Sequence, residues 1–439
     1  MFNYLLLFGA TFLTVIIGFA ISKIEKEGFN WITVFVGLAI FSPLMFGGFS
    51  WYEEAFFLGV VLGARKYFLS GQRSREHSLS KVQLLFILYF LFAIINGFAY
   101  FYQQNGEIPF RKIRWVLFLI LIFLIAKLSS KETFAFYRIR TSHLVSISAF
   151  LVFYISWQLI VQFQSGMTAN SQYAQNPTKG YTSAIWVNTA YFTLESFVFF
   201  LLALFVLCRV NSKKEKSLAM LVLFLSAFSQ SLTLSRGGVL LICLSSTLIV
   251  FWLTRSRKYS TAISILTILL FALLLGLRIS SPTGVQDFVQ DIEATVKIPM
   301  DLSVTSREND RLQQFREVIS VHQSNNAENK LRIFIGYGVR TSGDVLATRS
   351  GSGSSNDFSM SLLPSAFLEF GLIGLFLFLL LIMDRVRIRR KDFGFEQIIR
   401  LSCLFGTLAT TLIVNNFDDL LLYAIILQGH VYKNVIRVA

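Results

Sequence analysis

Charged residues are scarce in this chain of 439 residues: they make up 15%, whereas hydrophobic residues make up 54%. Soluble domains carry about 25% charged residues, so this composition argues against a soluble fold. The apolar residues also arrive in blocks close to the roughly 20 residues that a helix needs to cross a bilayer. The blocks cover residues 2–22, 32–49, 55–70, 82–101, 144–163, 218–234, 238–254, 261–279 and 361–383, with shorter runs at 115–127, 196–208, 401–414 and 418–429. We therefore predict an all-α polytopic membrane protein with about 12–13 transmembrane helices.

Cysteine and histidine are rare as well, with three and four residues respectively. Cys208, Cys243 and Cys403 lie in or at the ends of apolar runs and show neither metal-ligand spacing nor a disulfide framework. The sequence contains no HExxH motif, no Walker A loop and no GxGxxG motif in a strand–turn–helix context. We therefore expect no metal and no cofactor. A cleavable signal peptide is not expected either, because no charged segment precedes residues 2–22 and no small-residue cleavage site follows them.

The net charge of +15 comes from basic clusters in short linkers between the apolar runs, a pattern that does not indicate nucleic-acid binding. Short loops rich in Lys and Arg stay in the cytoplasm, so these clusters are predicted to share that side. They comprise Arg65, Lys66, Arg73, Arg75 and Lys81; Lys127, Lys131, Arg138 and Arg140; Arg209, Lys213, Lys214 and Lys216; Arg255, Arg257 and Lys258; and Arg385, Arg387, Arg389, Arg390 and Lys391. Arg111, Lys112 and Arg114 are an exception, and the side of the N-terminus stays open.

This arrangement predicts three parts: a helix bundle over residues 1–279, a large periplasmic loop over 280–360, and C-terminal spans over 361–439. Long loops are exempt from the positive-inside rule, so the arginines of the loop do not oppose an outer location. Apolar residues at helical spacing predict an amphipathic helix over residues 285–296. Thr305 and Glu308 have the spacing of a capping box, which predicts the start of a second helix there. Glycine- and serine-rich turns follow.

Ser235, Arg236, Gly237 and Gly238 lie between two apolar runs, on the outer side according to the charge pattern. Arginine can hold a diphosphate through two parallel hydrogen bonds, and glycines at a helix start leave backbone amides open to an anion. An arginine that extends to the membrane interface beside a glycine turn is the plainer interpretation of the same residues. The four residues alone leave both interpretations open.

Three features in order resemble the O-antigen polymerase and O-antigen ligase superfamily over roughly residues 220–385. They are the Ser-Arg-Gly-Gly segment, then Arg311 followed by a helix and Gly336-Tyr337-Gly338, then a segment from Met360 that ends in Glu369-Phe370-Gly371-Leu372-Ile373-Gly374. The ligase branch carries a histidine where this chain has Met360, which favours the polymerase branch. The spacing of Arg340 and Gly351 also resembles that of polymerase loops.

The resemblance implies a metal-independent glycosyltransferase of the bacterial inner membrane whose site faces the periplasm. It would transfer a growing glycan from undecaprenyl diphosphate to the non-reducing end of another lipid-linked repeat unit. Its implied partners are these lipid-linked glycans and membrane lipids, with a chain-length regulator protein as a further candidate. An O-antigen ligase and a flippase or transporter of lipid-linked sugars are the alternatives.

The implied site combines arginines for the diphosphate with a carboxylate for the acceptor hydroxyl. Arg236 and Arg311 are expected to converge on one cavity, and Glu369, Asp310 and Asp357 are unranked candidates for the base. Glu369 has a rival structural role, bracing the helix start near Gly371. The catalytic candidates are Arg236, Arg311 and Glu369, and the substrate-binding candidates are Arg278, Arg307, Arg340, Gly237, Gly238, Asp310 and Asp357.

Overall fold

The computed structural model describes twelve helices and a few residues between them. The described residues are 2–24, 31–42, 52–65, 80–106, 110–129, 139–164, 192–209, 212–232, 236–280, 318, 327–339, 341–342, 344–345, 362–386, 398–399, 402, 404, 406 and 423–425. The helices are α1 (Phe2–Ile24), α2 (Trp31–Phe41), α3 (Tyr52–Gly63), α5 (Lys81–Asn105), α6 (Phe110–Ser129), α7 (Thr141–Gln164), α8 (Phe192–Arg209), α9 (Lys213–Leu232), α10 (Arg236–Arg255), α11 (Tyr259–Ser280), α14 (Ala327–Ile335) and α16 (Leu362–Val386). This part of the chain contains no strand, so the predicted all-α class is confirmed there.

Five of these helices, namely α5, α8, α10, α11 and α16, are long and apolar enough to cross a membrane. Four shorter apolar helical stretches lie within α1, α2, α6 and α7. Side chains such as Phe12, Leu88, Phe251, Leu270 and Phe376 are exposed on these helices, and lipid is the solvent that suits such faces. These properties support the prediction of a membrane-embedded protein. The total number of spans, about 12–13, stays a prediction.

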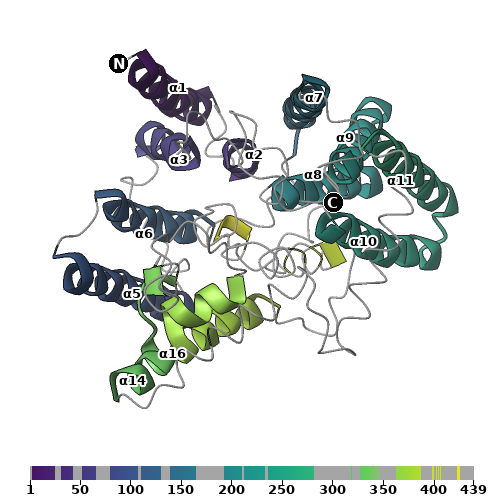
Figure 1. Cartoon of the computed structure of the whole chain (residues 1–439). Helices are drawn as coiled ribbons and strands as arrows, with labels where there is room; N and C mark the ends of the chain where they lie inside the picture. Colours follow the sequence, from purple (N-terminus) through teal and green to yellow (C-terminus); the bar gives the residue numbers. More distant parts are fainter. Residues whose placement is uncertain are drawn as a thin grey trace. The chain divides into compact units, whose positions relative to one another are not determined.

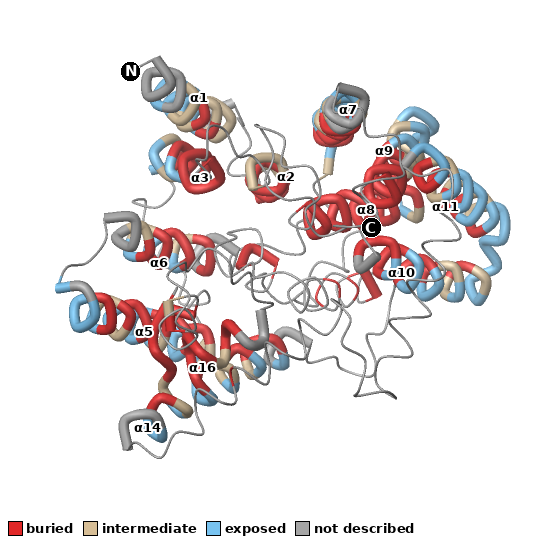
Figure 2. Tube along the Cα trace, in the orientation of Figure 1, coloured by how far each residue is buried: buried red, intermediate tan, exposed pale blue. Residues whose placement is uncertain are grey.

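The helices fall into two units. The first unit (Met1–Gln72, Phe134–Lys297 and Ile388–Thr410) contains α1 to α3 and α7 to α11. Its core is α8, which is buried from Phe192 to Leu207 and packs against α9 and α10 (Figures 1 and 2). Serine side chains replace apolar contacts where α8 meets α9: Ser196 donates to the backbone carbonyl of Ser226 at 3.0 Å. Such short polar side chains let two membrane helices approach closely.

Glycines also bring α1 and α3 together. A Cβ added at Gly59 or Gly18 would collide with the backbone of the other helix, at Val15 and Phe56 respectively. Gly59 and Gly63 lie one helical turn apart on α3, which is the GxxxG spacing of closely packed membrane helices. The two backbones are therefore in direct contact over this stretch.

The second unit (Arg73–Thr133, Ile298–Arg387 and Thr411–Ala439) contains α5, α6, α14 and α16. A capping box fixes the start of α5, where the Ser80 hydroxyl accepts from the backbone amide of Gln83 and the Gln83 side chain accepts from the Ser80 amide. The rings of Phe90 and Phe370 are 5.6 Å apart, and those of Phe86 and Phe378 are 6.1 Å apart. Helices α5 and α16 are therefore antiparallel, and the start of α16 lies toward the Asn105 end of α5.

Two features of this unit differ from the sequence-based expectation. The segment predicted as one span over residues 361–383 is broken at Gly371, whose φ of 61° and ψ of −171° are not helical. The resemblance implied a helix between Arg311 and Gly336 but did not place it at α14, because nine residues with a polar start are too few to fold as an isolated helix. The packing of α14 against α16 supplies the missing stabilisation (Figure 1). The loop helices expected near residues 285–296 and after Thr305 lie outside the described residues, apart from the helical and buried Val318.

Candidate functional site

The break in α16 creates the candidate site. A helix that ends leaves its last carbonyl groups without intrahelical partners. Gly371 ends the first half of α16, so the carbonyls of Leu368, Glu369 and Phe370 must find donors elsewhere. The hydrocarbon region of a membrane contains no water to act as a donor. Each carbonyl left without a hydrogen bond there costs several kcal/mol.

Residues 336–339, called the glycine segment below, provide two of the donors. The amide of Tyr337 donates to the carbonyl of Leu368 at 2.7 Å, and the amide of Gly338 donates to the carbonyl of Glu369 at 2.9 Å. The segment therefore satisfies two of the carbonyls at the broken end of α16. It brings together the GxG and Glu-x-Gly motifs, which the sequence placed about 30 residues apart.

The other side of the glycine segment lies against α5. The amide of Val339 donates to the carbonyl of Ala93 at 3.1 Å. Gly338 has a φ of 105°, and a Cβ added there would collide with the backbone of Gly97. A Cβ on Gly97 would in turn meet the carbonyl oxygen of Val339 at 3.0 Å. Glycine is required at both positions because two backbones touch at this point.

A tyrosine from α5 satisfies the third carbonyl of the break. The Tyr89 hydroxyl lies 2.6 Å from the carbonyl oxygen of Phe370 and 3.2 Å from that of Ile335, the last residue of α14. Two helix ends therefore share one hydroxyl donor. A Cβ added at Gly371 would collide with the carbonyl of Phe334, so the glycine at the break also makes room for α14.

A buried arginine fixes the start of the glycine segment. Arg332 is 9% exposed, and its Nη1 donates to Oδ1 of Asn96 at 2.7 Å and to the carbonyl of Gly336 at 3.3 Å. The side-chain amide Nδ2 of Asn96 donates to the same Gly336 carbonyl at 2.9 Å. The guanidinium also lies 5.3 Å from the centre of the Tyr337 ring. A cation inside a membrane protein needs such partners, because hydrocarbon does not solvate it.

The carboxylate of Glu369 lies beside this junction and is 1% exposed. Its Oε1 accepts a hydrogen bond from the Ser342 hydroxyl at 2.7 Å, and Ser342 is itself buried. Thr341 anchors the intervening turn by donating its hydroxyl hydrogen to the carbonyl of Gly338 at 2.7 Å. The backbone carbonyl of Glu369 accepts from the glycine segment and its side chain accepts from Ser342, so both polar groups of this residue contact the loop. Its predicted rival role at the helix start near Gly371 stays a prediction. A buried carboxylate beside a hydroxyl can accept a proton or orient a substrate hydroxyl.

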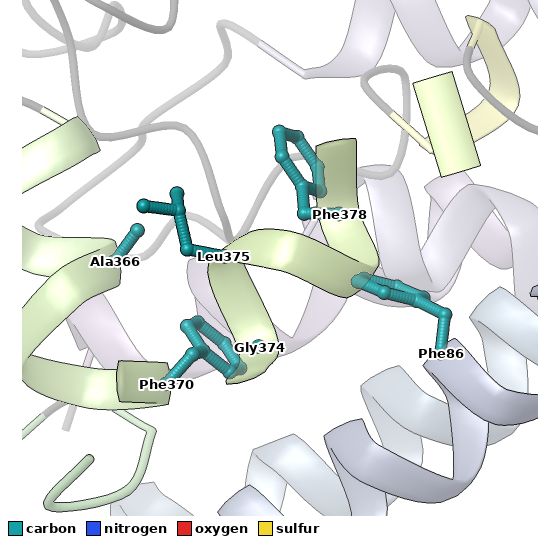
Figure 3. Close-up of a pocket in the computed structure, with 6 residues that line it drawn as sticks. All are labelled: Phe86, Ala366, Phe370, Gly374, Leu375 and Phe378. Carbon is teal, nitrogen blue, oxygen red and sulfur yellow. The ribbon is translucent and has the colours of Figure 1, made fainter. Parts of the chain in front are cut away.

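A small apolar pocket lies next to the break (Figure 3). Phe86 of α5 lines one side, and Ala366, Phe370, Gly374, Leu375 and Phe378 of α16 line the rest. A pocket with only apolar walls does not hold ordered water. The pocket is therefore a small packing defect beside the kink and not a polar binding site.

A second buried carboxylate occurs in the first unit. Glu195, in the first turn of α8, is fully buried and accepts a hydrogen bond from the Ser42 hydroxyl at 2.9 Å. The amides at a helix start favour a negative charge there. This pair ties the end of α2 to the start of α8 within that unit.

The remaining predicted site residues divide between described and undescribed positions. Arg236 begins α10 and Gly237 and Gly238 follow in its first turn, as the sequence indicated, although the side chain of Arg236 lies outside the described residues. Arg278 is exposed at the end of α11. The expected convergence of Arg236 with Arg311 stays a prediction. The other positions that lie outside the described residues are Arg307, Asp310, Arg311, Arg340 and Asp357.

Sequence reasoning missed Ser342, Arg332, Asn96 and Tyr89. A signal for two of them was present, because Asn96 and Tyr89 are polar residues inside the apolar run 82–101. Polar groups within a span usually face a partner inside the protein. Arg332 and Ser342 gave no such signal, since both lie in a polar loop in which any residue could face water.

Comparisons with protein-family profiles, with curated protein sequences and with solved structures find no match to this chain.

Proposed function

We propose that the protein polymerises lipid-linked oligosaccharide repeat units at the outer face of the bacterial inner membrane. The observation that carries the proposal is the junction of the glycine segment with the broken span α16, beside the buried carboxylate of Glu369. Two motifs that define the resemblance, GxG and Glu-x-Gly, are in direct contact there. A sequence resemblance formed by chance would not require its separate motifs to meet in space.

In the proposed reaction, an oxygen of the acceptor sugar attacks the anomeric carbon of the donor glycan. The bond between that carbon and the diphosphate oxygen breaks, and its electron pair leaves with undecaprenyl diphosphate. Arg236 and Arg311 would stabilise the departing charge, with Arg278, Arg307 and Arg340 as further contacts. The proton of the acceptor hydroxyl would pass to a carboxylate, and the candidates are Glu369, which the Ser342 hydroxyl holds in place, Asp310 and Asp357.

A transporter of lipid-linked sugars is a second candidate, and one observation favours it. Transporters often build their sites from interrupted membrane helices, and α16 is interrupted at Gly371. The polymerase stays the leading proposal because a break alone does not require the ordered Ser-Arg-Gly-Gly, GxG and Glu-x-Gly motifs.

The experiment that tests the proposal removes the gene from its native strain and analyses the lipid-linked glycans. Loss of a polymerase leaves single repeat units on the carrier at the outer face, where an impermeant periodate reagent can oxidise them. Loss of a transporter leaves the same units protected at the inner face. Loss of a ligase leaves long polymer on the carrier.

Single units exposed at the outer face, converted to polymer when the purified protein is supplied in liposomes, would support the proposal. Protected single units or carrier-bound polymer would overturn it in favour of the transporter or the ligase respectively. The Arg236→Ala variant serves as the matched inactive protein, provided that its level in the membrane equals that of the wild type.

A further inference from the structure

The glycine segment lies deep along α5. Ala93, which accepts the amide of Val339, is twelve residues from both Lys81 and Asn105, the ends of α5. At 1.5 Å per residue, that is about 18 Å from either end. A hydrocarbon core is about 30 Å thick, so Ala93 lies near the middle of the predicted span. The contacts of Tyr89 and Asn96 lie at similar depth.

The chain reaches this depth and returns. Val318, before α14, and Val345, after the glycine segment, belong to one buried cluster with Tyr100 and Phe101, close to the Asn105 end of α5, and the Tyr337 side chain reaches the same cluster. The backbone at Ile335, Gly338 and Val339 contacts α5 one to three helical turns further in. The described residues Val318, 327–339, 341–342 and 344–345, called the hairpin below, therefore begin and end toward one end of α5 and lie deepest near its middle.

Non-helical backbone is tolerated inside a membrane where the protein buries it and satisfies its polar groups. The hydrogen bonds described above satisfy those groups in the glycine segment. The glycine segment is buried from Gly336 to Val339. The hairpin thus meets the condition for lying inside the hydrocarbon region.

The outer face of α14 carries two large apolar side chains although α14 belongs to a polar loop. Leu331 is 57% exposed and Phe334 is 53% exposed, while Arg332 points inward to Asn96. Lys330 is also exposed, and a lysine at this position can extend its ammonium group toward the membrane interface. The neighbouring spans also expose apolar side chains, such as Ile95 of α5 and Leu372 of α16.

We propose that the described residues of this hairpin are re-entrant in the membrane, and that its helix α14 contacts lipid acyl chains through Leu331 and Phe334. The occupant of this face is the bilayer itself, because the face continues the lipid-exposed faces of α5 and α16 at the same depth. The inference is independent of the proposed reaction, since it depends only on depth and exposure.

The hairpin also sets the depth of the Glu369 carboxylate. Its partner Ser342 lies between Val339, at the level of Ala93, and Val345, at the level of Tyr100 and Phe101. The carboxylate is thereby placed within the half of the membrane nearer to the Asn105 end of α5. A group that reaches it must enter from the membrane or through a channel, which suits a lipid-linked substrate better than a free sugar.

Spin labels test the hairpin. The three native cysteines are first replaced by alanine, and single labels are then introduced through Leu331→Cys and Phe334→Cys in protein reconstituted in liposomes. Phe376→Cys, on the exposed face of α16, is the lipid reference, and Lys214→Cys, exposed in the polar first turn of α9, is the water reference. Collision with oxygen reports lipid, and collision with a water-soluble nickel chelate reports water.

Labels at 331 and 334 with an oxygen-to-nickel accessibility ratio within about twofold of that at 376 would support the proposal. A ratio like that at 214 would place α14 in water and overturn it. Low accessibility to both reagents would mean that another protein covers the face, which would overturn it as well. Each outcome is read without any activity assay, so failure of the hairpin is distinguishable from failure of the polymerase proposal.

Discussion

Ser342 donates its hydroxyl hydrogen to Oε1 of Glu369 over 2.7 Å, although 27 residues separate the two in the chain. Both side chains are buried. The hydrogen bond holds the carboxylate of Glu369 in one orientation, which a group that orients a substrate hydroxyl requires. The pair therefore joins the turn after the glycine segment to the broken span.

The first prediction concerns Glu369→Gln. The amide keeps an oxygen that can accept from Ser342, so the fold should persist, but it cannot accept a proton. Polymer formation should fall at least about a hundredfold, the lower range for loss of general base catalysis. Polymer synthesis by purified protein in liposomes measures the effect.

Ser342→Ala is the matched variant for this pair. It removes one hydrogen bond and keeps the carboxylate, so only a loss of severalfold is expected, equal to about 1 kcal/mol. Wild-type polymer yield from Glu369→Gln would remove Glu369 as the base and leave Asp310 and Asp357 as candidates.

A second prediction addresses the backbone contact of Gly338. The variant Gly338→Ala should lower the free energy of unfolding by about 3 kcal/mol or more, because the new Cβ meets the Gly97 backbone and φ is 105°. Gly106→Ala is the control, since its φ of 72° is similarly unfavourable but nothing lies within 4 Å of an added Cβ. About 1 kcal/mol is expected there.

Thermal or denaturant unfolding in detergent compares the two variants. If the two variants lose equal free energy of unfolding, backbone conformation alone explains the effect of Gly338→Ala. The close approach of Gly338 to α5 would then contribute nothing to stability.

Arg332 and Asn96 give a third prediction, on energetic coupling. Asn96→Ala leaves a buried cation without one acceptor and should destabilise by about 2–3 kcal/mol, as for a hydrogen bond to a charged group. In the Arg332→Met background the same change should cost less than about 1 kcal/mol, because no charge is left to satisfy. A double-mutant cycle measures the difference, and additive losses would argue against the observed contact.

The fourth prediction tests how α1 and α3 pack. Gly59→Leu should separate the two helices, since even a Cβ at Gly59 collides with the Val15 carbonyl. Cysteine crosslinking between α1 and α3 should drop severalfold in detergent. Gly9→Leu on α1 should leave it unchanged, because nothing lies within 4 Å of an added Cβ there. Unchanged crosslinking in both variants would contradict the close backbone contact.

The fifth prediction is that Arg236→Ala and Arg311→Ala each abolish polymer and leave single repeat units on the carrier. Lysine at either position should rescue only partly, because the forked geometry that binds two oxyanions is lost. Glycan analysis of complemented strains measures this outcome. Full activity of the lysine variants would show that charge alone suffices.

The helices could be predicted because composition and apolar periodicity act locally. The apolar runs 82–101 and 261–279 became α5 and α11 with ends shifted by only a few residues. Gly237 and Gly238, at the start of the apolar run 238–254, likewise predicted a helix start near Arg236. Local signals failed at Gly371, where glycine inside an apolar run is compatible with either a continuous helix or a break.

The sequence by itself therefore determined the all-α class, the apolar helices and the identity of Glu369 as a candidate, because each depends on composition or on short motifs. Only the tertiary structure decided that α16 breaks at Gly371, and that Tyr337, Gly338 and Tyr89 satisfy the carbonyls left by the break. It likewise decided the partner of Glu369. Hydrogen bonds between distant segments form only where backbones approach closely, and that approach depends on packing that no single segment encodes.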